Sequence, residues 1–140
     1  MISLPGYTIT EKVFENKNTL IYRAIEDNTK LSVILKTHRN NFPTNREIFA
    51  YRKEFEITSK LQIEGILKSY ELKKIGTQYL ILFEDIRGIS LKSYLEENNI
   101  SLTTLIQIFL SIVNIISRIH KQNIIHKDIN PLNILIHPET

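Results

Sequence analysis

The sequence contains no cysteine and no tryptophan, and it is poor in glycine and proline. The absence of cysteine excludes a disulfide framework and a thiolate metal site, and the four histidines lack the spacing of metal ligands. Four glycines and four prolines among 140 residues form no linker, and no internal repeat divides the chain. With 42% hydrophobic residues, the chain is expected to bury one core.

A long hydrophobic run is also missing. The most apolar stretch, 102–119, contains no more than three apolar residues in succession. Its polar residues Gln107, Ser111, Asn114 and Arg118 recur at helical spacing, whereas a membrane span needs about 18 apolar residues in succession. We therefore expect an amphipathic helix that is buried inside a domain.

The net charge and the N-terminal residues argue against two further classes of protein, those that bind nucleic acid and those that carry a signal peptide. The net charge of +3 is modest, and the basic residues form no stripe interleaved with aromatic residues, so a nucleic-acid partner has little support. Residues 1–6 have neither the basic start nor the apolar run of a signal peptide, so the cytoplasm is the expected location.

The most informative pattern lies at residues 126–135, which read HKDINPLNIL. Asp128 follows His126 by two positions, and Asn133 follows Asp128 by five. Phosphoryl transfer uses this arrangement, because an Asp can accept the proton of the attacking hydroxyl while a nearby Asn holds a magnesium ion. The alternative is a turn between a helix and a hairpin that happens to carry two charges.

A lysine upstream strengthens the first interpretation. Lys36 ends an apolar segment within 31–37, a stretch rich in the branched residues that favour strands. Glu54 follows 18 residues later in a helical pattern that runs approximately over 45–61. Glu47 and Glu56 share that helix, and any of the three carboxylates could be an ordinary solvated charge.

A third informative segment begins at Tyr79. Residues 79–83 form a nearly continuous apolar run, which is typical of a strand buried on both faces. Gly88 follows this run, and Ser90 and Leu91 lie at the predicted start of another helix.

Together these segments resemble a eukaryotic-type serine/threonine protein kinase domain. The run at 126–133 is similar to the catalytic loop of that family, and 88–91 is similar to the segment that opens the helix after the hinge. The opening residues 4–7 and the closing run HKDINPLNILIHPET further resemble the N-terminal kinase domain of large multidomain bacterial sensor proteins, which carry downstream ATPase, GAF and histidine kinase regions.

The resemblance implies an α+β fold that is only partly present. Residues 1–83 would form the small lobe, a five-stranded antiparallel sheet with one helix. Residues 84–91 would form the hinge, and 92–140 the start of the large helical lobe through the catalytic loop. We expect the chain to be a truncated kinase domain that is inactive alone, because the Asp-Phe-Gly magnesium motif would follow residue 140.

The resemblance also assigns roles in the binding of ATP and Mg²⁺. In the catalytic set, Lys36 would contact the α- and β-phosphates, Glu54 would orient that lysine, Asp128 would be the catalytic base and Asn133 would bind magnesium. Asn130 replaces the lysine that neutralises the transferring phosphoryl group in serine/threonine kinases. The adenine would contact a second set, which consists of Ile21, Ile34, Phe83 as the gatekeeper, Glu84 and Ile86 of the hinge, and Leu135.

The glycine-rich loop of the family has no counterpart here. Phe14, Asn16 and Thr19 occupy its three glycine positions, and Glu15 adds a negative charge beside the expected phosphates. Asn tolerates left-handed backbone geometry, so a hairpin can still form, but it would cradle phosphates less well.

Three functions therefore stay open. The first is ATP-dependent phosphorylation of serine or threonine in a protein substrate during signal transduction. The second is a pseudokinase, a regulatory nucleotide-binding module within a multidomain sensor protein. The third and weakest is a small-molecule phosphotransferase. The protein substrate, the activating signal and the oligomeric state cannot be read from these residues.

Overall fold

The computed structural model of the chain describes residues 3–61, 63–124 and 134–137. The chain divides into two units. The first unit consists of Met1–Gln62 and Leu67–Asp85, and the second of Ile63–Ile66 and Ile86–Thr140.

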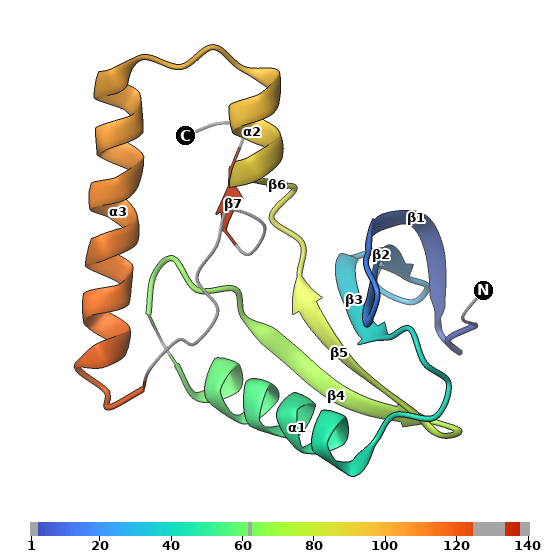
Figure 1. Ribbon diagram of the computed structural model, residues 1–140. Coiled ribbons are helices and arrows are strands. Elements are labelled where there is room, and N and C mark those ends of the chain that lie inside the picture. Colours follow the sequence, from blue (N-terminus) through green and yellow to red (C-terminus); the bar gives the residue numbers. More distant parts are fainter. Residues whose placement is uncertain (1–2, 62, 125–133, 138–140) are drawn as a thin grey trace. The chain divides into compact units, whose positions relative to one another are not determined.

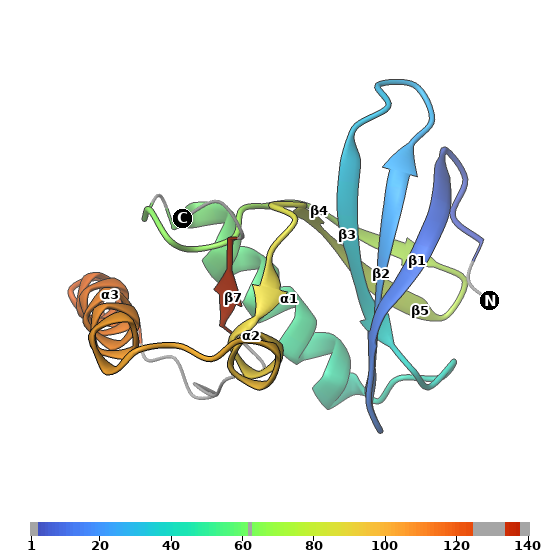
Figure 2. The same cartoon turned by 90° about the horizontal axis from the view of Figure 1, so that it is seen from above.

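A five-stranded sheet forms most of the first unit (Figure 1). The strand order is β1-β2-β3-β5-β4, and every neighbouring pair is antiparallel. The strands are β1 (Tyr7–Glu15), β2 (Thr19–Glu26), β3 (Ser32–His38), β4 (Ser69–Ile75) and β5 (Gln78–Glu84). The expected antiparallel sheet of five strands is confirmed, and Figure 2 shows its strong twist.

Alternation along the strands places apolar side chains on both faces of this sheet. One core contains Val33 and Leu35 of β3 together with Leu80 and Leu82 of β5. A second core on the opposite face contains Ile81, so β5 is buried on both faces, as its apolar run predicted.

Helix α1 (Asn45–Lys60) covers this second core and packs on β4 and β5 (Figure 1). Its start is fixed by a capping box, in which the Thr44 hydroxyl accepts from the N–H of Glu47 and the Glu47 carboxylate accepts from the N–H of Thr44. Tyr51 and Phe55 point into the core from the buried side of the helix. The cap and the apolar side chains together set which face of α1 meets the sheet.

The second unit contains helices α2 (Leu91–Glu97) and α3 (Leu102–His120) and the short strands β6 (Ile89–Ser90) and β7 (Leu135–Ile136). The strands β6 and β7 pair antiparallel beside α2 (Figure 2), and the N–H of Leu91 donates to the carbonyl of Ile134 at 2.7 Å.

The segment Ile63–Ile66 also belongs to the second unit, although it lies between α1 and β4 in the sequence. Gly65 has φ +97°, and a Cβ at this position would lie 2.5 Å from Cδ1 of Ile115. The positive φ favours glycine there, and a larger residue would also require the Ile115 side chain to shift.

The helix expected over 102–119 is present as α3, and Ile119 is its only buried residue. Among the described residues, none covers the face that carries Ile106, Phe109, Leu110 and Val113, which are about half exposed or more. Within the described part of the chain, α3 is also the one helix long and apolar enough to cross a membrane. That property rests on length and composition alone, and core helices of soluble proteins share it.

We predict that the isolated chain binds a hydrophobic dye through this face. Replacing both Phe109 and Val113 with Gln should lower the dye fluorescence, because these side chains are 54% and 61% exposed. Leu31→Gln is the matched control, since Leu31 is 50% exposed but lies in the first unit. A monomeric, cooperatively unfolding chain that is silent to the dye would show that this face is covered in solution.

Candidate functional site

The strand register brings four of the proposed site residues to one face of the sheet. Directly paired residues of antiparallel strands point to the same side. Ile21 pairs with Lys36, and Ile34 pairs with Phe83. Because Ile34 and Lys36 are two positions apart on β3, all four side chains lie on the face that α1 covers at one end.

Lys36 and Glu54 meet at this face. The Lys36 ammonium lies 2.9 Å from each carboxylate oxygen of Glu54, and the two side chains are 27% and 33% exposed. The two competing carboxylates of α1 have other partners, because Glu47 closes the capping box and Glu56 pairs with Lys60. Lys36 therefore presents a fixed cation that a phosphate could approach.

The remaining residues that we expect to contact adenine lie at the end of β5 and in the second unit. The N–H of Glu84 donates to the carbonyl of Lys68 at 2.9 Å, so any contact of Glu84 with a purine would use its carbonyl. In the second unit, a Cβ added at Gly88 would lie 3.2 Å from Ile86 and 3.3 Å from Leu135. Ile86 and Leu135 thus both border Gly88.

Three proposed residues lie outside the described residues, namely Asp128, Asn130 and Asn133. Their roles as base, phosphate neighbour and magnesium ligand stay predictions. The described part of the chain contains no group of three His, Cys, Asp or Glu side chains that could hold a metal ion.

Several backbone N–H groups at the turn between β1 and β2 are hydrogen-bonded within the turn itself. The side-chain oxygen of Asn16 accepts from the N–H groups of Asn18 and Thr19 at 2.9 and 2.8 Å. The N–H of Asn16 in turn donates to the carbonyl of Thr19 at 3.0 Å. In a glycine-rich loop, backbone N–H groups of this kind bind phosphate, but here the turn itself uses them.

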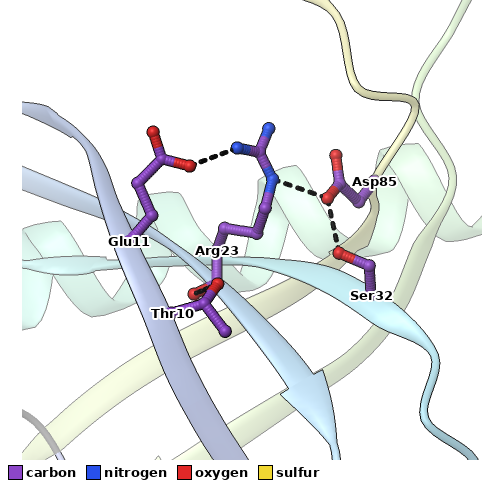
Figure 3. A network of polar contacts seen from close by, with 5 residues as sticks. All are labelled: Thr10, Glu11, Arg23, Ser32 and Asp85. Atoms are coloured by element: carbon purple, nitrogen blue, oxygen red, sulfur yellow. Dashed lines mark hydrogen bonds and ion pairs between the residues drawn. The ribbon is translucent and has the colours of Figure 1, made fainter.

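A buried ion pair that the sequence patterns missed fixes the end of β5 (Figure 3). Arg23 Nε donates to the Asp85 carboxylate at 2.7 Å, and Ser32 donates to the same oxygen at 2.6 Å. The Asp85 side chain is only 2% exposed. On its other side Arg23 pairs with Glu11, which is 57% exposed. Strands β1, β2 and β3 are thereby tied to the residue after β5.

A second missed feature is a stacked aromatic pair beside Lys36. The rings of His38 and Tyr51 lie 3.8 Å apart at 21°, and the Lys36 ammonium is 5.7 Å from the Tyr51 ring centroid. Burial lowers the pKa of His38, nearby Lys36 lowers it further, and Glu47 opposes both. Burial raises the pKa of the Tyr51 phenol. Nε2 of His38 has no hydrogen-bond partner among the described residues, so a neutral imidazole suits this position.

Comparison with known protein sequences identifies a family and several relatives. Residues 7–140 match the protein kinase domain family. The chain is 25% identical over 93% of its length to a probable serine/threonine-protein kinase of Clostridium acetobutylicum. It is 32% identical over 74% of its length to serine/threonine-protein kinase PrkC of Bacillus subtilis, and 30% identical over 93% to an Aurora kinase of Schizosaccharomyces pombe.

These relatives are much longer than the chain. The chain spans 20% of the Clostridium protein, 16% of the Bacillus protein and 37% of the Schizosaccharomyces protein.

We predict that Arg23→Met lowers the free energy of unfolding by about 3 kcal/mol, because it removes the cation beside a buried carboxylate. The double variant Arg23→Met/Asp85→Asn should recover part of this loss. Glu11→Gln is the matched control and should cost less than about 1 kcal/mol, since Glu11 is exposed. Urea unfolding of the four proteins measures these differences. Equal losses for Arg23→Met and Glu11→Gln would contradict a structural role for the buried pair.

The lowered pKa of His38 predicts a loss of stability in acid. Below the ordinary pKa of 6.5 the unfolded chain binds a proton at His38 before the folded chain does. The free energy of unfolding should therefore fall as the pH drops from 6.5, by at most about 1.4 kcal/mol per pH unit. His38→Phe keeps the stack on Tyr51 and should remove this slope. Unfolding curves at pH 7.5 and 5.5 measure it, and an identical slope in both proteins would contradict the assignment.

Proposed function

The chain belongs to the protein kinase family, and from this membership we propose that the protein transfers the γ-phosphoryl group of ATP to a serine or threonine hydroxyl of a protein substrate. The observation that supports this most directly is the ion pair of Lys36 and Glu54 on the face that also carries Ile21, Ile34 and Phe83. The serine/threonine kinases among the relatives support the class of acceptor.

The first unit fits the nucleotide in two respects. Lys36 supplies a positive charge whose position Glu54 fixes, and a triphosphate needs such a charge. Ile21 and Ile34 offer apolar surface that suits the face of a purine ring.

The transfer step would depend on residues of the run at 126–133. Asp128 would take the proton of the attacking hydroxyl, and Asn133 would hold magnesium, which neutralises charge on the phosphates when bound. Glu54 would keep Lys36 aimed at the phosphates while this proton moves.

One observation favours a second function, that of a pseudokinase or regulatory nucleotide-binding module. The N–H groups of Asn18 and Thr19 already donate to Asn16, so these two backbone donors are not available to stabilise a transferring phosphoryl group. Nucleotide binding through Lys36 would persist in such a module. The placement of the kinase unit in a large multidomain sensor protein, with further domains of the same polypeptide as partners, is a proposal that rests on sequence resemblance.

We predict that the chain binds ATP weakly and that Lys36→Met reduces the affinity about tenfold or more, because a charge-assisted contact to phosphate is lost. Lys53→Met is the matched control, since Lys53 is an exposed lysine next to Glu54 on α1. Calorimetric titration measures both. Tight binding that Lys36→Met leaves unchanged would show that the phosphate site lies elsewhere.

An assay of phosphoryl transfer distinguishes a kinase from a regulatory nucleotide-binding module. The full-length protein with radiolabelled ATP and a serine/threonine peptide should give labelled peptide, and Asp128→Asn should abolish it. Binding of ATP through Lys36 without transfer would favour the regulatory module.

A further inference from the structure

We propose that the turn between β1 and β2 holds the triphosphate of the nucleotide through the side chain of Lys17, in place of the backbone N–H groups that a glycine-rich loop would use. The inference rests on the nucleotide binding proposed above and adds the residue and the type of contact.

Two backbone N–H groups of this turn are not available to an anion. Asn16 occupies the N–H groups of Asn18 and Thr19, as described above. The carbonyls are engaged as well, because the Arg39 N–H donates to Asn18 at 2.9 Å and the Arg39 guanidinium donates to Asn16 at 3.3 Å. These contacts restrain the turn, so we expect an anion to bind it mainly through side chains.

The charges around the turn favour an anion. Glu15, which the sequence suggested would repel phosphates, pairs with Lys12 at 2.5 Å and lies 3.6 Å from the Arg39 guanidinium. The four charged side chains Lys12, Glu15, Lys17 and Arg39 thus carry three positive charges and one negative charge, a net of +2. A phosphate beside this turn would meet a positive local potential.

Lys17 is the cation of this group that stays available. It is exposed, and no ion pair or hydrogen bond joins it to another of the described residues, whereas Lys12 and Arg39 are engaged with Glu15. A lysine ammonium is a strongly hydrated point charge on a flexible stem, which allows it to follow a phosphate group.

The turn also lies at the end of the sheet that is close to Lys36. Thr19, the first residue of β2, pairs with His38, and Ile21 pairs with Lys36. Two residues of a strand span about 7 Å. The turn therefore begins about this far along the sheet from Lys36, which would contact the α- and β-phosphates. Lys17 is therefore suited to the far end of the same triphosphate.

The test compares the affinities for ATP and for adenosine by calorimetric titration of the chain at low salt. We expect Lys17→Met to weaken ATP binding about three- to fivefold, as for an exposed charge pair, and to leave adenosine binding unchanged. Lys30→Met is the matched control, because Lys30 is an exposed lysine in the turn at the other end of β2 and should have no effect. The Lys17 effect should vanish near 0.5 M salt, where exposed charges are screened.

A double variant separates a local contact from bulk charge. Asn16→Gly frees the N–H groups of Asn18 and Thr19, so in that background Lys17→Met should weaken ATP binding less than it does in the wild type. Equal losses in both backgrounds, or equal effects of Lys17→Met and Lys30→Met, would overturn the inference. The proposed function would still stand if ATP binding depended on Lys36. A chain that binds no ATP would overturn both.

Discussion

The alternation of side chains along β3 is the constraint on which the first unit depends. Val33 and Leu35 point into one core, while Ile34 and Lys36 point to the opposite face, and β2 and β5 fix this register from both sides. A slip of one residue would move the Lys36 ammonium into an apolar core, where an unpaired charge is very costly. The same packing that stabilises the sheet therefore positions the cation of the candidate site.

The parts of the fold that follow from short-range patterns could be predicted from the sequence. The apolar run at 79–83 identified β5, and the branched residues near Lys36 identified β3. The spacing of 18 residues distinguished Glu54 from its neighbours on α1 only through a family resemblance, since all three carboxylates suit a helix surface equally well. The roles of Asp128, Asn130 and Asn133 stay predictions.

The parts that depend on long-range contacts could not be predicted. Arg23 and Asp85 are 62 positions apart, and neither stands out locally as a residue with a buried partner. The stack of His38 on Tyr51 likewise depends on how α1 meets β3. The sequence shows that the β1–β2 turn lacks glycine, but it does not show that the Asn16 side chain accepts hydrogen bonds from two backbone N–H groups of the turn. The pattern over 102–119 predicted an amphipathic helix, but such a pattern does not say which residues cover its apolar face.

The segment Ile63–Ile66 has a consequence for how such domains can recombine. The chain passes from one unit to the other after residues 62, 66 and 85, so no single cut separates the two units. A chimera that joined residues 1–85 of one homologue to the remainder of another would take position 65 from the first and position 115, which lies against it, from the second. A residue larger than glycine at position 65 would require the side chain at position 115 to shift. The packing at these two positions therefore has to be matched whenever the two parts come from different chains.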